Sequence, residues 1–367
     1  MDTHRSAESR CAALDANRSA EPRDPTSVTA NHSAESHDAT SDTGRPRTAR
    51  GRRIALVARL WYVDFMRESP PRLFQRQKTL LALLHALGGQ SGKTDFQKLL
   101  FLYCRRVGAD APYDFVPHRF GAYSFSAKRD RLKLQELGLL APVDRWELTS
   151  EGRRVASQLA VTAEVSRTAR ELPACRGDDL VALTYRRFPW YATRSEIATR
   201  VLENDDAALA RIDAEKCADR GGGLLTIGYE GHSLESYLDA LLRAGTSILC
   251  DVRRNPLSRK YGFSKSTLRE GCNAVGIRYE HLPELGIASD RRRTLETQAD
   301  YDALFADYER EDLPHQGDAI GQIAAWIVAN ERVTLTCYEH LPHQCHRHCV
   351  AEAVERELAK TGATSHL

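Results

Sequence analysis

The feature that most constrains the fold of this chain is a strand-to-helix transition that occurs three times in its C-terminal half. The segments 224–228, 247–252 and 333–336 are rich in apolar and β-branched residues, which favours buried strands. Helices are expected after them, over 234–242, from about Ser264 and over 351–358, where apolar residues recur with the helical period. Strands that alternate with helices are typical of a mostly parallel sheet. The sequence therefore predicts a Rossmann-like α/β domain over residues 223–367.

Polar residues follow each predicted strand. Because the carboxyl ends of parallel strands meet at one edge of a sheet, ligands bind there in open α/β folds. A helix that starts at this edge also presents free N–H groups, which suit an anion or a thiolate. We therefore expect nine side chains to surround one pocket: Tyr229, Glu230, Asp251, Arg253, Arg259, Cys337, Glu339, Cys345 and Arg347.

The arginines in this set, Arg253, Arg259 and Arg347, are the expected phosphate ligands, because a guanidinium binds phosphate or carboxylate in a bidentate manner. Asp251 is expected to orient one of them. The alternative is a structural Asp–Arg pair that fixes the loop.

Cys345 is the candidate nucleophile, since the neighbouring His346, a guanidinium and a helix start all lower the pKa of a thiol. Cys337 is open to three interpretations: a resolving thiol, a metal ligand or a small buried residue that ends a strand. Glu230 and Glu339 are candidates for acid–base chemistry or for contacts with sugar hydroxyls. Tyr229 joins the ligand-binding set.

A metal site is the less favoured alternative. Seven potential zinc ligands lie between Cys337 and Cys349, namely Cys337, His340, His343, Cys345, His346, His348 and Cys349. However, the segment has no C-x2-C pair, which structural zinc sites usually show. We assign no metal ligand, and the cofactor is left open.

Four ordered motifs, T-I-G-Y-E-G-H-S, D-V-R-R-N-P-L-S-R, Y-E-H-L-P-E-L-G and C-Y-E-x5-C-H-R, resemble the bacterial domain-of-unknown-function 488 family. The resemblance extends from about Leu224 to the C-terminus, and it implies a compact α/β domain without an established activity. This chain has Ile287 where the family usually has a second glycine. That difference raises the question of whether the backbone there needs the freedom of glycine.

The N-terminal half predicts a mainly helical winged-helix domain over residues 66–160. A helix over 73–87 should end at Gly88-Gly89, and Thr94 or Asp95 should cap the next one. A basic helix over 124–137 is followed by G-L-L, a short hairpin at 146–148 and L-T-S-E-G-R-R-V-A, which is the layout of a winged helix-turn-helix. With F-Q-K-L-L-F-L and F-G-A-Y-S, the segment resembles YwgA-like winged-helix proteins.

The basic helix supplies the expected contacts to nucleic acid. Cations along such a helix neutralise phosphates without reading the base sequence. The expected ligands are Lys128, Arg129, Arg131 and Lys133. The alternative is a solvated basic helix in a domain that is used for protein contacts.

The other segments and the composition complete the outline. Residues 1–65 are predicted to be a disordered tail or an annotation extension upstream of a start at Met66, and 161–222 connect the two domains. Nine cysteines, an odd number without a secretory signal, indicate reduced thiols in the cytoplasm. No apolar run approaches the roughly 20 residues that span a membrane. The terminal Ser365-His366-Leu367 is interpreted as the end of a short strand.

These patterns predict a DNA- or nucleotide-associated protein. Its winged helix would dock on nucleic acid, and its Arg- and Cys-lined pocket would bind or process a phosphorylated group. The enzymatic version is a thiol-dependent hydrolase or transferase that acts on a nucleotide or nucleic acid. The alternatives are a non-catalytic, ligand-sensing transcriptional regulator and a protein-interaction adaptor. A phosphorylated small molecule is the second expected partner, while the reaction, the DNA sequence preference and the oligomeric state are left open.

Overall fold

The computed structural model describes residues 72–216, 221–292, 295–359 and 364–367 of the chain. The predictions for residues 1–65 and for a start at Met66 lie outside this range, as does part of the connecting segment. Within the described residues, none of the helices is long and apolar enough to cross a membrane.

The C-terminal module is built on a five-stranded parallel sheet with the strand order β7-β6-β8-β5-β9. The strands are β5 (Gly223–Gly228), β6 (Ile248–Asp251), β7 (Arg278–His281), β8 (Arg332–Cys337) and β9 (Ser365–His366). The helices are α11 (Leu234–Arg243), α12 (Lys265–Ala274), α13 (Gln298–Asp307), α14 (Gly317–Val328) and α15 (Arg347–Glu357). The parallel α/β fold that the sequence predicts is therefore confirmed, including the short final strand.

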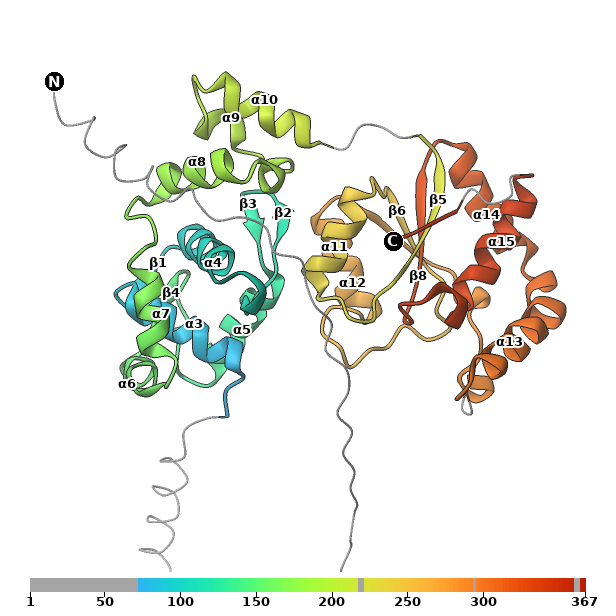
Figure 1. Cartoon of the computed structure of the whole chain (residues 1–367), viewed down its shortest axis with the longest axis horizontal. Coiled ribbons are helices and arrows are strands. Elements are labelled where there is room, and N and C mark those ends of the chain that lie inside the picture. Colours follow the sequence, from blue (N-terminus) through green and yellow to red (C-terminus); the bar gives the residue numbers. More distant parts are fainter. Residues whose placement is uncertain (1–71, 217–220, 293–294, 360–363) are drawn as a thin grey trace, which may run out of the picture. The chain divides into compact units, whose positions relative to one another are not determined.

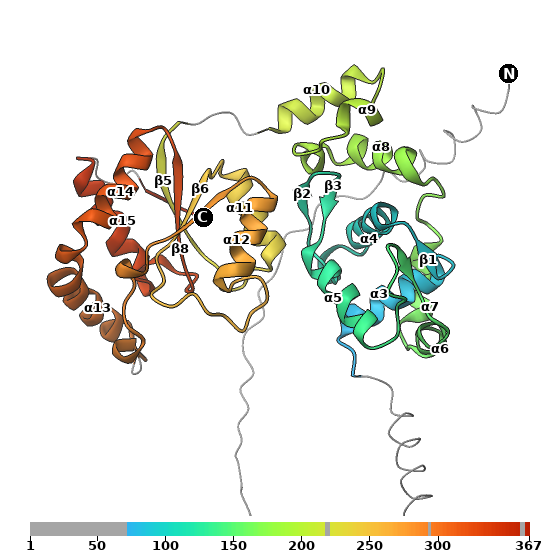
Figure 2. The ribbon, with the colours of Figure 1, turned by 180° about the vertical axis from the view of Figure 1, so that it is seen from behind.

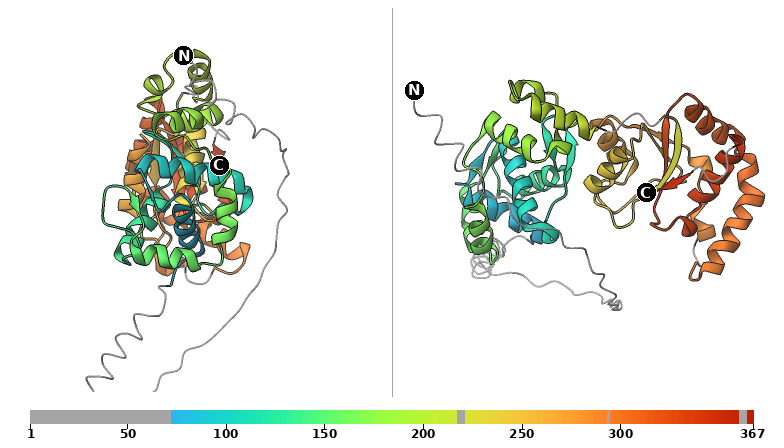
Figure 3. Two further views of the ribbon diagram at one scale, coloured as in Figure 1. Left: turned by 90° about the vertical axis from the view of Figure 1, so that its left-hand side faces the viewer. Right: turned by 45° about the horizontal axis from the view of Figure 1, so that its top comes forward.

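Helices cover both faces of this sheet. Figure 1 shows α11 and α12 against one face and α13, α14 and α15 against the other, and Figure 2 shows the same arrangement from behind. The right-hand view in Figure 3, identified by colour, also has these two groups of helices on opposite sides of the strands. Side chains alternate between the two layers, so that Leu249 packs with the α11–α12 core and Cys250 with the α13–α15 core.

The N-terminal module is mainly helical. Its helices are α3 (Gln75–Ala86), α4 (Lys93–Val107), α5 (Phe125–Glu136), α6 (Ser150–Gln158), α7 (Thr162–Ala169), α8 (Gly177–Arg187), α9 (Ala198–Val201) and α10 (Asp206–Glu215). Two short antiparallel pairs complete it, β1 (Gln90–Ser91) with β4 (Trp146–Glu147) and β2 (Val116–His118) with β3 (Gly121–Tyr123). The β2–β3 hairpin was not predicted from the sequence.

Local signals explain most of the helix ends. Gly88 and Gly89 follow α3 with φ values of 92° and 82°, a conformation that glycine adopts readily. Ser124 caps α5 by accepting a hydrogen bond from the N–H of Ala127. The predicted cap of α4 at Thr94 or Asp95 is wrong, because α4 begins at Lys93 and both residues lie in its first turn.

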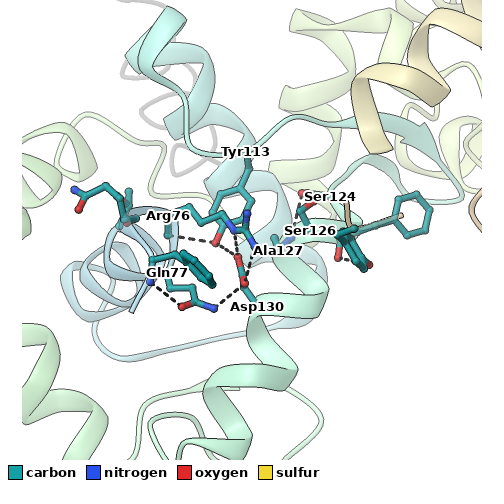
Figure 4. Close-up of polar contacts among 12 residues, drawn as sticks. Arg76, Gln77, Tyr113, Ser124, Ser126, Ala127 and Asp130 are labelled. Carbon is teal, nitrogen blue, oxygen red and sulfur yellow. Dashed lines mark hydrogen bonds and ion pairs between the residues drawn. The ribbon is translucent and has the colours of Figure 1, made fainter. Parts of the chain in front are cut away.

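A buried carboxylate holds α5 in the N-terminal module. Asp130 accepts hydrogen bonds from Arg76 Nε at 2.6 Å, from the Gln77 amide at 2.8 Å and from the Tyr113 hydroxyl at 2.9 Å (Figure 4). The donors lie outside α5, in α3 and in the segment before β2, so this network fixes α5 against its neighbours. The exposed side chains of α5 therefore project from a helix that is held in place.

Candidate functional site

The ends of three neighbouring strands bring the predicted residues to one edge of the sheet. In the parallel register Gly228 lies beside Cys337, and Asp251 lies beside Thr336. Adjacent residues of a strand point to opposite faces. Asp251 and Thr336 therefore face α11 and α12, while Cys337 faces the layer of α13–α15.

Asp251 forms a closed pair with Arg253 on the α11–α12 side. Its carboxylate accepts hydrogen bonds from Arg253 Nε at 2.8 Å, from Arg253 Nη2 at 2.5 Å and from the Tyr279 hydroxyl at 2.6 Å. Arg253 also donates to the Phe263 carbonyl, and its guanidinium lies 5.0 Å from the centre of the Tyr229 ring. Both charged side chains are buried. This geometry matches the structural Asp–Arg pair, because the carboxylate and the guanidinium are satisfied internally.

Arg347 is buried on the other side of the sheet. It donates through Nε to the Thr226 hydroxyl at 3.3 Å, and through its two Nη atoms to the carbonyls of Glu339 and His340. The guanidinium thus holds the loop between β8 and α15 in place.

The expectation of one pocket around all nine side chains is therefore wrong. Arg253 and Arg347 lie on opposite faces of the sheet, and each binds protein groups. The physical reason is that successive side chains of a strand point to opposite faces of the sheet. This alternation continues to the last residues of each strand, so polar residues that are adjacent there lie on different faces.

The α13–α15 face carries a compact group of two thiols and an imidazole. Reactive or ligating atoms of Cys337, Cys345 and His346 all lie within 4.8 Å of one another, and all three side chains are buried. His346 Nε2 donates to the Val252 carbonyl at 3.0 Å. This bond leaves Nδ1 directed at the Cys337 sulfur, 3.7 Å away.

The two thiols differ in acidity. Hydrogen bonding from Cys345, together with the His346 ring, holds the pKa of Cys337 well below its usual range. Burial raises the pKa of Cys345, and the facing Cys337 sulfur raises it further. Burial by itself would lower the pKa of His346. The interactions with Cys337 and with the Val252 carbonyl are larger in sum, and the pKa of this imidazole is raised. The geometry therefore favours Cys337 as the thiolate, whereas the sequence analysis assigned that role to Cys345.

Glu339 and Arg292 complete the centre. A Glu339 carboxylate oxygen lies 3.5 Å from the Cys337 sulfur, and the same carboxylate forms an ion pair with Arg292. Burial raises the pKa of Glu339, and the Cys337 sulfur adds to the effect. Sequence reasoning missed Arg292. The only available signal was the arginine cluster that begins at Arg291, which has no motif to link it to Cys337.

The remaining predicted residues lie at the rim of this edge. Tyr229 is buried and stacks on Phe263 with ring centres 4.5 Å apart. Glu230 is exposed and accepts a hydrogen bond from the His340 N–H at 3.0 Å. Arg259 is exposed on the loop after β6.

Cys337, Cys345 and His346 are also the one group of His, Cys, Asp or Glu side chains within the described ranges that is close enough to hold a metal ion. The hydrogen bond from His346 Nε2 to a backbone carbonyl is the arrangement that orients metal-bound histidines. Three ligands are one fewer than a closed zinc site needs. Of the four other potential ligands, Cys349 contacts His348, at 3.4 Å.

The four predicted nucleic-acid ligands all lie on α5. Lys128, Arg129 and Lys133 are exposed and Arg131 is half-buried. Arg129 lies over the Tyr261 ring at 4.3 Å, Lys133 pairs with Glu136, and Arg131 donates to the carbonyls of Val143 and Arg145. Lys128 has no ion-pair partner among the described side chains.

The fold and this centre define a parallel α/β module with a buried thiol–imidazole group at its strand ends. Residues 233–354 of the chain match the family described as "Domain of unknown function DUF488". The match covers three of the four sequence motifs, whereas T-I-G-Y-E-G-H-S at 226–233 reaches it only with its last residue, and it does not include the N-terminal module. No curated protein and no solved structure matches the chain. Ile287, at the position that departs from the family pattern, is buried in the α13–α15 core without a positive φ.

Proposed function

We propose that the α/β module is a thiol-dependent hydrolase or transferase that acts on a phosphorylated group, with Cys337 as its nucleophile. The observation that carries this proposal is the position of the His346 ring between the Cys337 sulfur and the Val252 carbonyl. A nucleophile, a base and a group that orients the base are the arrangement on which thiol catalysis depends.

The proposed reaction has two steps. The Cys337 thiolate attacks phosphorus, the bond to the leaving oxygen breaks, and that oxygen takes the proton from His346 Nδ1. Water then gives a proton to the neutral imidazole while its oxygen attacks phosphorus, and the sulfur leaves as a thiolate. In a transferase an acceptor hydroxyl replaces water. Arg292 pairs with Glu339 and interacts with the Cys337 sulfur, so it would stabilise charge on the phosphoryl oxygens.

Access to Cys337 requires movement of the loop over residues 338–344. Cys337 is fully buried, whereas Tyr338 and Leu341 in this loop are 45% and 42% exposed. Arg347 binds the loop through the carbonyls of Glu339 and His340, and Glu230 binds it through the His340 N–H. The proposal therefore includes an opening step before chemistry.

The test uses p-nitrophenyl phosphate with the full chain. We expect p-nitrophenol release and a phosphoryl adduct that intact-mass and peptide mapping place on Cys337. Cys337→Ser should abolish both, while Cys250→Ser, which changes a buried thiol inside β6, should retain them. Absence of turnover and adduct would contradict the enzyme and favour the non-catalytic regulator, as would turnover that survives Cys337→Ser.

A metal centre is a second candidate, favoured by the proximity of the ligand atoms of Cys337, Cys345 and His346. Elemental analysis of the purified full chain separates it from the nucleophile. One equivalent of zinc that disappears in Cys337→Ser and in His346→Gln, but not in Cys250→Ser, would establish a metal site and overturn the thiolate mechanism.

We further propose that the N-terminal module associates with nucleic acid or nucleotides through α5, in the manner of a winged-helix domain. The exposed Lys128, Arg129 and Lys133 support this, because exposed cations on a fixed helix neutralise phosphates. Changing these residues together with Arg131 to alanine should weaken binding to duplex DNA. It should also reduce the slope of log K against log salt, by roughly 0.9 per lost phosphate contact. Arg356→Ala, an exposed cation on α15, is the control, and an unchanged slope in the quadruple variant would contradict the proposal.

A further inference from the structure

A pocket of about 290 Å³ lies in the N-terminal module, apart from the thiol centre. Its walls come from the start of α4, the β2–β3 hairpin, α5 and β4. The lining residues are Lys93, Thr94, Gln97, Lys98, His118, Arg119, Phe120, Gly121, Tyr123, Lys128, Arg131 and Trp146. This set contains five cationic side chains and no carboxylate. Its volume is at the lower end of the range for small-molecule sites.

Lys98 is the unusual member of the lining. It is only 2% exposed, and its ammonium donates one hydrogen bond, to the Ala122 carbonyl at 2.9 Å. An ammonium has three donors. No acidic side chain in the described part of the chain pairs with it, and burial lowers its pKa to about 7. A buried cation that lines a cavity without a counter-charge indicates an anionic ligand.

Other groups that line the pocket favour an anion. Lys128 is exposed on α5 and has no ion-pair partner among the described residues. The helix α4 begins at Lys93 without a side-chain cap, so its first N–H groups are free of intrahelical partners. Neighbouring His118 adds no charge at neutral pH, because burial lowers its pKa to about 4.

The rest of the wall is aromatic. Phe120 is 42% exposed at the turn of the hairpin, and Tyr123 is stacked against His118 with ring centres 4.6 Å apart. Trp146 also lines the pocket, and the Arg131 guanidinium lies 5.5 Å from the centre of its indole ring. Flat apolar walls beside a cationic end suit a ligand with a planar ring and an anionic group.

We infer that this pocket binds a nucleoside monophosphate, either free or as one unit of a single strand. The phosphate would lie at Lys98 and Lys128, and the base would stack against Phe120 and Tyr123. The inference rests on the proposed association of this module with nucleotides or nucleic acid, and it does not depend on the thiol centre.

The experiment is titration calorimetry with the full chain. The probes are adenosine 5′-monophosphate, adenosine, inorganic phosphate, an eight-residue oligothymidylate and a DNA duplex. We expect the monophosphate or the single strand to bind more tightly than adenosine or phosphate alone. Lys98→Met should weaken that binding at least about tenfold, the cost of losing a charge-assisted hydrogen bond. Arg356→Met changes an exposed cation on α15 that does not line the pocket, and it should leave this binding within about twofold.

A second variant tests the aromatic wall of the pocket independently of Lys98. Phe120→Ala removes an exposed wall and should weaken the monophosphate but not inorganic phosphate. Tight binding of the monophosphate identifies a free nucleotide as the source, and binding of the oligothymidylate alone identifies a strand. Binding of the monophosphate or the oligothymidylate that is unchanged in both variants would overturn the inference. Failure of both the monophosphate and the oligothymidylate to bind the parent chain would also overturn it. If neither the monophosphate nor the oligothymidylate binds but the duplex still binds in a salt-dependent manner, the pocket assignment fails and the proposed role of α5 stands.

Discussion

At the scale of single residues, Lys98 is the position where burial and charge conflict most directly. Its pKa falls from an ordinary value of 10.5 to about 7 in the folded chain. Between these two values the unfolded chain binds the proton and the folded chain does not. Stability therefore rises with pH across this interval, and the full cost of the buried charge is present below pH 7.

Lys98→Met should remove this cost. We expect the variant to be more stable than the parent chain at pH 6, by on the order of 5 kcal/mol, with the difference shrinking as the pH rises from 7 toward 10. Urea unfolding of both proteins across this range measures the difference, in which the other titrating groups cancel. A difference that stays constant with pH, or that grows with it, would contradict the assignment of a buried, uncompensated ammonium.

The same scale shows what residue identity could and could not predict. The motif residues at the strand ends were found from the sequence, and the Asp251–Arg253 pair was one of two alternatives that it offered. The choice of Cys337 over Cys345 depends on which sulfur faces His346 Nδ1. That proximity is set by the tertiary structure, so helix-start arguments alone could not weigh Cys337 against Cys345.

At the scale of elements, the thiol centre depends on the close approach of β5 to the loop after β8. A Cβ added to Gly228 would lie 1.8 Å from the Glu339 carbonyl oxygen, and backbone cannot yield as a flexible side chain does. Glycine is required here by lack of space and not by its φ angle.

Gly228→Ala should therefore displace the loop over 338–344 and disturb the Cys337–His346 contact. We expect a loss of stability of about 2 kcal/mol and faster alkylation of Cys337 by iodoacetamide, because the loop no longer seals the thiol. Gly321→Ala in α14, where the added Cβ meets no atom within 4 Å, is the matched control and should be neutral or slightly stabilising. Equal alkylation rates in the two variants would show that the loop does not control access.

Elements with strong local signals were predicted well. The expected helix start at Ser264 coincides with the N-cap of α12, and the predicted strands fall within two residues of β5, β6 and β8. The short strands were missed. The β2–β3 hairpin contributes only three residues on each side, and β7, Arg278–His281, is largely polar, so neither carries a clear hydrophobic period.

At the scale of the whole molecule, composition and motif order were enough to predict a parallel α/β sheet in the C-terminal part of the chain. They could not place the functional groups, either there or in the mainly helical N-terminal part. The expected single pocket divides into two faces because sheet alternation is a property of the assembled strands. The cavity around Lys98 is formed by α4, α5, β4 and a hairpin, which meet only in the folded module. No single sequence motif marks it.

The central claim is that the Cys337–His346 pair contains a thiolate at neutral pH, and the ultraviolet absorbance of thiolates during a pH titration tests it most directly. The full chain is first freed of metal with a chelator. We predict a thiolate signal that persists well below the usual pKa of cysteine, that is lost in Cys337→Ser, and that remains in Cys250→Ser. Identical titrations of the parent chain and Cys337→Ser would contradict the account. So would a signal that is lost in Cys345→Ser but retained in Cys337→Ser.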